Sequence, residues 1–204
     1  TRTVSYEATI LTALCTISWL ILLIILHTMI DLKKLFVKVE EHDGDVYVAD
    51  YTKQTNSAVK VKIAGTPFKD IAYFHLHNGN NLPLWAVNFE DNPNYIPEGV
   101  GNCECMIRVR NVEKGWWLLC ELKYCLEKNI ENNADKAYQQ LKETWQLLVD
   151  RKVIKKKKHR TYLNISIPDH SNRAPFISFT STQDEQLKWL KKNKILLLTT
   201  TKQS

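Results

Sequence analysis

The stretch that decides the fold is CECMIRVRNVEKGWWLLCELKYC, residues 103–125. Apolar residues dominate two runs, Asn102–Val109 and Trp116–Tyr124, and the turn-forming sequence NVEKG separates them. This pattern predicts a β-hairpin. A helix with one apolar stripe is expected next, at Asn133–Asp150, followed by a strand at Tyr162–Ile167.

The same criteria predict the other elements along the chain. Strands are expected at Asp45–Tyr51, Ala58–Ile63, Ile71–His77, Leu84–Phe89 and Ile195–Thr200, and helices at Ile30–Glu41 and Thr182–Lys192. The first three of these strands favour an antiparallel meander. We therefore expect one α/β domain over residues 31–204, with a mixed central sheet flanked by helices. Its β-rich first part spans 31–98 and its core spans 99–204.

Charged residues on the hairpin are the main functional signal. Side chains on a strand alternate between two faces, so Glu121 and Lys123 share one face of the second run. We expect Glu104 to pair onto the same face, which brings two carboxylates and one ammonium together. Two carboxylates bind a hard cation such as Mg²⁺, which polarises a phosphoryl oxygen and lowers the pKa of a bound water. The alternative is a solvated hairpin face carrying an ordinary salt bridge.

An acidic residue on one strand, E-x-K on the next and a glutamine on the following helix resemble the PD-(D/E)XK nuclease superfamily, in particular its small uncharacterised bacterial members. The resemblance covers roughly residues 98–200. It implies a restriction-endonuclease-like fold and Mg²⁺-dependent hydrolysis of DNA or RNA. It also implies that Glu104 and Glu121 bind the metal and that Lys123 assists the attacking water.

The same resemblance suggests two supporting positions. Gln140, in AYQQLKETW, matches the glutamine that some members use to support the site, and Gln139 is its neighbouring alternative. Glu98, in IPEG, is the conceivable upstream acidic residue. The chain also allows a different class of function, a nuclease-fold module that binds or interacts without catalysis.

The composition excludes disordered and low-complexity proteins, because 44% of the residues are hydrophobic and only 6 are glycine and 6 proline. The net charge is +6, and part of the excess lies in one basic run. Its candidate nucleic-acid-binding residues are Lys155, Lys156, Lys157, Lys158 and Arg160. Such a run contacts phosphates without reading base sequence. A solvated connection, or a face that binds anionic lipid or a partner protein, is the alternative.

Residues 1–30 are predicted to form a transmembrane or leader helix. Ala8–Ile30 is a 23-residue run without a formal charge, and about 1.5 Å per residue makes it long enough for a hydrocarbon core of roughly 30 Å. Lysines follow the run, so the remainder is expected in the cytoplasm, free or anchored to the inner face of a membrane. Because the first methionine is Met29, the run is alternatively upstream sequence outside the native product, or a buried helix.

Cysteine and histidine supply two weaker metal signals. Cys103, Cys105 and Cys120 are expected together on the face opposite the carboxylates, as core residues, since their spacing lacks the C-x2-C pattern of most structural zinc sites. His75 and His77 share one strand face and would suit a transition metal. With no acidic or cysteine cluster nearby in the sequence, a polar strand face is the favoured interpretation.

Overall fold

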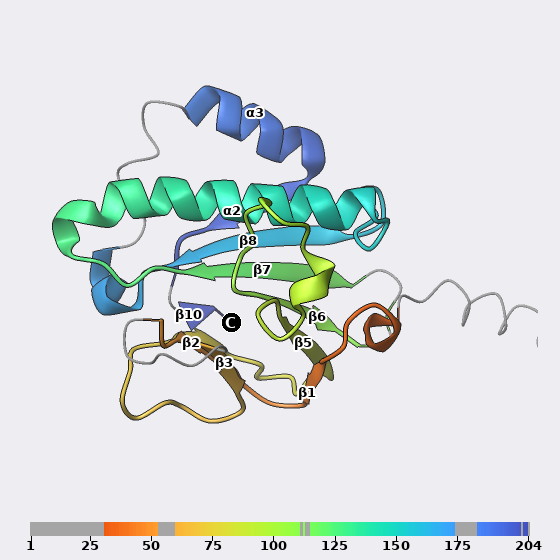
Figure 1. The fold of residues 1–204 in the computed structure, drawn as a ribbon, viewed down its shortest axis with the longest axis horizontal. Coiled ribbons are helices and arrows are strands. Elements are labelled where there is room, and N and C mark those ends of the chain that lie inside the picture. Colours follow the sequence, from red (N-terminus) through yellow and green to blue (C-terminus); the bar gives the residue numbers. More distant parts are fainter. Residues whose placement is uncertain are drawn as a thin grey trace, which may run out of the picture.

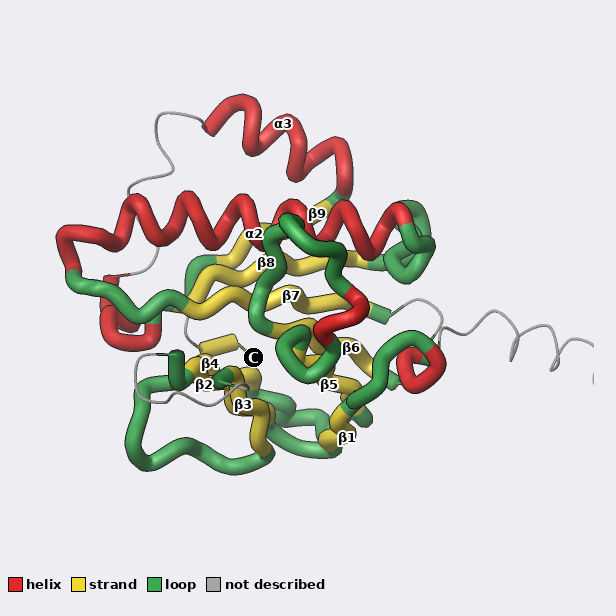
Figure 2. The backbone as a smooth tube through the Cα atoms, viewed as in Figure 1, coloured by secondary structure: helices red, strands yellow, loops and turns green. Residues whose placement is uncertain are grey.

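The computed structural model describes residues 31–52, 60–110, 112, 115–173, 183–200 and 202–203. In these residues the chain forms three layers, with two helices, a large mixed sheet and a small sheet stacked in that order (Figures 1 and 2). The α/β class and the mixed central sheet are therefore confirmed. The expectation that helices flank the sheet holds for one face, because the small sheet covers the other.

The large sheet has the strand order β1-β5-β6-β7-β8-β9. These strands are β1 (Glu40–His42), β5 (Leu84–Asn88), β6 (Cys105–Val109), β7 (Trp116–Leu122), β8 (Arg160–Ser166) and β9 (Ile195–Leu198). Neighbours from β1 to β7 run antiparallel, and β7, β8 and β9 run parallel. The predicted hairpin is the β6–β7 pair, although most of its turn lies outside the described residues.

Helices α2 (Ile130–Asp150) and α3 (Gln183–Asn193) lie between these parallel strands in the chain. Both helices were predicted, and α2 begins three residues earlier than expected. Its buried stripe packs against the large sheet because apolar residues recur at helical spacing. The stripe consists of Ile130, Ala134, Ala137, Tyr138, Leu141, Thr144, Trp145 and Leu148.

The small sheet has the order β10-β4-β2-β3. Its strands are β2 (Val46–Asp50), β3 (Val61–Ala64), β4 (Phe74–Leu76) and β10 (Lys202–Gln203). The meander prediction was wrong, because β2 pairs with both β3 and β4 and lies between them. Four of the five β2 residues are buried, which suits a central strand better than an edge strand. Apolar residues of this sheet pack against β5, β6 and β7.

The N-terminal part departs most from prediction. The helix expected at Ile30–Glu41 is a short 3₁₀ helix, η1 (Leu32–Lys34), and the chain is extended again by Glu40 in β1. Leu32 and Phe36 are buried in the helix-side core, so their spacing reflects burial and not a continued helix. The other 3₁₀ helices are η2 (Pro93–Tyr95), η3 (Glu127–Asn129) and η4 (Pro168–Arg173).

The hydrophobic run Ala8–Ile30, predicted as a membrane or leader helix, lies outside the described residues. Within the described ranges, no helix is both long and apolar enough to span a bilayer.

Candidate active site

Glu104, Glu121 and Lys123 meet at one end of the β6–β7 hairpin. Cys105 pairs with Cys120 across the two antiparallel strands, so the next residues outward, Glu104 and Glu121, face each other. The Glu104 backbone N–H donates to Glu121 Oε2 at 3.1 Å, and the Lys123 ammonium forms an ion pair with Glu121 Oε1. The structure thus brings Lys123 into contact with Glu121 and joins Glu104 to Glu121 through its backbone, while the Glu104 carboxyl lies close enough to feel both charges.

Burial makes this cluster electrostatically costly. The Glu121 side chain is 0% exposed, and burial raises its pKa to about 7 even though Lys123 and the Glu104 backbone N–H favour its charged form. Burial, and then the neighbouring Glu121 carboxylate, raise the pKa of Glu104 well above its ordinary value. Raised pKa values of two neighbouring carboxyl groups mark this end of the hairpin as a candidate functional site.

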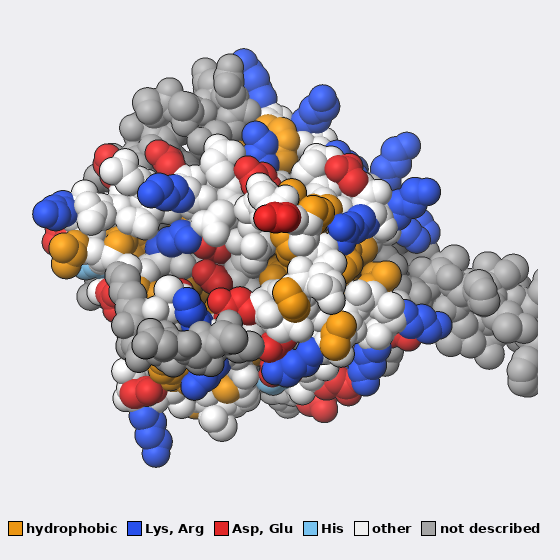
Figure 3. Space-filling view, viewed as in Figure 1, with side chains coloured by type: hydrophobic (Ala, Val, Ile, Leu, Met, Phe, Trp, Pro, Cys, Tyr) orange, Lys and Arg blue, Asp and Glu red, His pale blue; other side chains and the backbone are white. Residues whose placement is uncertain are grey.

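Two further carboxylates act on the cluster, and the sequence did not reveal either of them. Asp50, at the end of β2, raises the pKa of both Glu104 and Glu121, and Glu90, just after β5, raises that of Glu104. Acidic side chains gather near the middle of one face of the molecule, with lysine and arginine side chains around them (Figure 3). Glu98, the upstream acidic residue that the sequence suggested, is exposed in the loop before β6.

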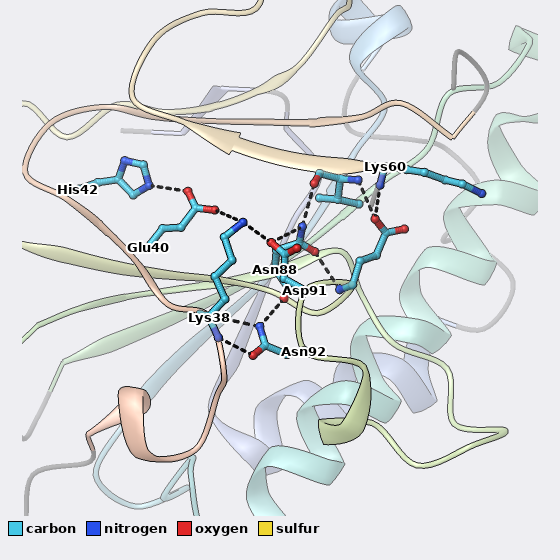
Figure 4. Close-up of polar contacts among 9 residues, drawn as sticks. Lys38, Glu40, His42, Lys60, Asn88, Asp91 and Asn92 are labelled. Carbon is cyan, nitrogen blue, oxygen red and sulfur yellow. Dashed lines mark hydrogen bonds and ion pairs between the residues drawn. The ribbon is translucent and has the colours of Figure 1, made fainter. Parts of the chain in front are cut away.

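A polar network holds the loop that carries Glu90. Glu90 Oε2 accepts the backbone N–H groups of Lys60 and Val61 at 2.6 and 2.8 Å. Its neighbour Asn88 donates to the Val61 carbonyl at 2.8 Å, so the loop after β5 is fastened to the start of β3 (Figure 4). Asn92 donates to the carbonyls of Asn88, at 2.7 Å, and of Lys38, at 3.1 Å. These bonds join both sheets beside the carboxylates.

Helix α2 fixes the segment that leads into Glu104. Gln140 donates to the Asn102 carbonyl at 3.0 Å, Glu143 accepts the Gly101 N–H at 2.8 Å, and Thr144 accepts the Cys103 N–H at 2.8 Å. Glu143 and Thr144 lie three and four positions after Gln140, so all three side chains reach the same side of the helix. Gln140 therefore acts on the site through the backbone, as a positioning residue, while Gln139 is exposed.

The approach of this segment to α2 depends on a glycine. A Cβ atom at Gly101 would lie 2.6 Å from Glu143 Oε2 and 3.6 Å from Gln140 Cγ. A larger residue would therefore displace the Glu143 side chain and weaken the attachment of the segment.

The three cysteines predicted as core residues are buried, but one of them lies on the opposite face of the large sheet from the one predicted. Cys105 and Cys120 are buried between the two sheets, whereas Cys103 is buried on the helix side. Regular strand structure begins only at Cys105, and the Cys103 N–H bonds to Thr144 on α2, so the alternation of faces does not extend back to Cys103. In the described part of the chain, no group of three close metal-ligand atoms includes a cysteine.

The basic run lies at the other end of the sheet. Arg160 pairs with Trp116 at the start of β7, whereas Glu121 pairs with Ile165. That separation is five residues along β8, or about 17 Å at the rise of a β-strand. Lys156 lies over the Trp145 ring at 4.6 Å and contacts Asn193, while Lys157 and Lys158 are exposed. The run is not part of the carboxylate cluster, and its contact with nucleic acid stays a prediction.

The cluster offers carboxylate oxygens as metal ligands and an ammonium group beside them. Comparisons of the chain with protein-family models, with curated proteins and with solved structures gave no match. Side-chain geometry is therefore the basis for the function proposed below.

Proposed function

We propose that this protein is a metal-dependent nuclease that hydrolyses phosphodiester bonds of DNA or RNA. The observation that carries the proposal is the buried Glu121 carboxylate, which lies between the Lys123 ammonium and the backbone of Glu104. Burying the Glu121 carboxylate in an apolar hairpin costs free energy, and a catalytic role accounts for a carboxylate kept in such a place.

The donor set suits Mg²⁺. This ion prefers oxygen ligands, and it is usually bound by one or two carboxylates, several waters and the phosphates of the substrate. Glu104 and Glu121 would supply those carboxylates, with Asp50 close enough to influence both electrostatically. A divalent cation would favour the ionised forms that burial disfavours, so the raised pKa values support a cation site.

Each group of the site would have a distinct role in phosphodiester hydrolysis. Bound Mg²⁺ would polarise the phosphoryl oxygen and lower the pKa of a water. The Lys123 ammonium, which pairs with Glu121, would orient that water or stabilise negative charge at the phosphate. Glu121 must be ionised to bind a cation, so with a pKa of about 7 both cation affinity and cleavage are expected to rise as the pH passes neutrality.

The order of elements is consistent with the proposed PD-(D/E)XK relationship and with a restriction-endonuclease-like fold. Acidic residues on a hairpin are followed by a helix and then by a strand parallel to the second hairpin strand. The helix carries Gln140, which holds the segment before Glu104.

Cleavage of plasmid DNA and of a structured RNA by the purified full chain tests the proposal. Cleavage is expected with Mg²⁺ and not with EDTA, and Lys123→Met should reduce it by about 100-fold or more, as the loss of a charge-stabilising group does elsewhere. Lys128→Met is the matched control, because Lys128 is an exposed lysine in η3. Cleavage that survives EDTA, or that Lys123→Met leaves intact, would refute the assignment.

The second candidate function is a nuclease-fold module that binds without cleaving, and the exposed lysines of the basic run favour it. Salt-sensitive binding of nucleic acid without cleavage would support this function. Flotation with anionic liposomes that depends on Lys155–Lys158 would instead support lipid binding.

A further inference from the structure

A second cluster of metal-ligand side chains lies on the small sheet. Val46 pairs with Leu76, so the next residues outward, Asp45 and His77, face each other across β2 and β4. Asp45 Oδ2 lies 2.8 Å from His75 Nε2, and Asp45 Oδ1 lies 3.1 Å from His77 Nδ1. The acidic partner that the two histidines lack in the sequence is thus supplied by strand pairing, over a separation of 30 residues.

The three side chains are held in place by their neighbours. The Asn78 backbone N–H donates to Asp45 Oδ1 at 2.8 Å, and the His75 ring stacks on Tyr47 with centroids 4.5 Å apart and planes inclined by 7°. A Cβ atom at Gly79 would lie 2.9 Å from His77 Nε2, so a larger residue there would displace the imidazole from this position. Ligands that are fixed before the metal arrives lose less entropy on binding it.

We propose that Asp45, His75 and His77 form a binding site for a divalent transition-metal ion, with Zn²⁺ as the best match. Two imidazoles and one carboxylate are a donor set typical of Zn²⁺ and other late first-row ions, and they are poorly suited to Mg²⁺. One ligand atom from each residue lies within 4.8 Å of the others, a spacing that bonds of about 2.0–2.2 Å can close with small rotations. Binding replaces the hydrogen bonds between the rings and the carboxylate, and the protons on those nitrogens move to the other ring nitrogen or to solvent.

Three protein ligands leave at least one position open on a four-coordinate ion. His77 also lines a cavity of about 340 Å³, and its other walls include Leu84, Trp116 and Tyr162. A water, or a small molecule with a polar head and an apolar body, would suit an open position beside such a cavity.

This site is separate from the carboxylate cluster of the proposed nuclease. Asp45 precedes β2 and Asp50 ends it, so five residues, or about 17 Å of extended chain, separate the two sites along that strand. The donor atoms also differ, with nitrogen dominating one site and oxygen the other. The metal site can therefore be tested whether or not the protein cleaves nucleic acid.

Calorimetric titration of the metal-free full chain with Zn²⁺ tests the site. One ion is expected to bind at this site, and Asp45→Asn, His75→Gln and His77→Gln should each weaken that binding by more than the 10–100-fold that loss of an outer-shell partner costs. His42→Gln is the matched control, because His42 also lies beside a carboxylate, Glu40 at 3.6 Å, but belongs to no group of three metal-ligand side chains among the described residues. Its Zn²⁺ affinity should equal that of the wild type.

Two further measurements separate a loss of metal ligands from a loss of the folded structure. Circular dichroism of each metal-free variant checks its fold, and His77→Gln decides the question if His75→Gln unfolds, since the His77 side chain is 49% exposed. Co²⁺ bound at this site should show visible bands without thiolate charge transfer. Failure of the wild type to bind Zn²⁺, wild-type affinity in a folded His77→Gln, or a thiolate signature would each overturn the proposal.

Discussion

The Glu121→Gln substitution should make the protein more stable at neutral and alkaline pH. Glutamine has nearly the shape of a protonated glutamate and cannot ionise. In the wild type, the ionised carboxylate is buried with 0% exposure, next to a second carboxylate on Glu104. The substitution therefore removes a charge that the folded protein accommodates at a cost.

The magnitude follows from the pKa of Glu121. Folding raises it from 4.5 to about 7, and one pKa unit corresponds to about 1.4 kcal/mol, so ionisation costs the folded state about 3 kcal/mol. Because the folded-state pKa is raised, the native protein binds the proton more tightly than the unfolded chain does. The stability of the wild type is therefore fully present below pH 4.5 and falls as the pH rises through 7.

Urea unfolding of both proteins between pH 4.5 and 8.5, in buffer without divalent ions, measures the difference. The two free energies of unfolding should agree near pH 4.5, and the variant should exceed the wild type by up to about 3 kcal/mol above pH 7. Glu131→Gln, an exposed site in the first turn of α2, should leave the wild-type pH dependence unchanged. A constant difference across the pH range would refute the assigned pKa and the burial of charge on which it rests.

Three other substitutions test the surrounding structure by the same unfolding measurement. Thr144→Val removes the acceptor of the buried Cys103 N–H and should cost about 1–3 kcal/mol, and equal stability would mean that this bond does not hold the segment before β6. Leu141→Ala should cost about 2–5 kcal/mol, because Leu141 is 0% exposed on the buried face of α2, and a smaller loss would contradict that packing. Backbone and imidazole hydrogen bonds lower the pKa of Asp45, so in metal-free buffer Asp45→Asn should be less stable than the wild type at pH 7. This gap should close as the pH falls below 3.8, and a gap that persisted in acid would contradict the lowered pKa.

The local part of the site could be predicted from the sequence. A hairpin brings together residues that are near in the chain, so the predicted β6–β7 pairing was enough to bring Glu104, Glu121 and Lys123 to the same end of the hairpin. The buried stripe of α2 was equally visible, because its period of 3.6 residues is a property of one segment.

The long-range part could not be predicted in this way. Asp50 reaches the site through the packing of the two sheets, and Glu90 reaches it through the pairing of β5 with β6. Asp45 reaches His75 and His77 through the pairing of β2 with β4. No local spacing encodes such contacts.

Two of the errors arose where the apolar spacing did not reflect regular secondary structure. Cys103 lies two residues before β6 begins at Cys105, so the alternation of a strand does not apply to it. Its side chain is buried in the helix-side core. The apolar spacing at Ile30–Glu41 reflects two buried anchors, Leu32 and Phe36, in a segment that is largely not helical.

Anomalous diffraction from crystals soaked in Mn²⁺ tests the central claim most directly, because Mn²⁺ takes the same oxygen ligands as Mg²⁺. The proposed function predicts a peak at bonding distance from carboxylate oxygens of both Glu104 and Glu121. Soaked crystals with no peak there, and with the contact between Lys123 and Glu121 unchanged, would contradict it.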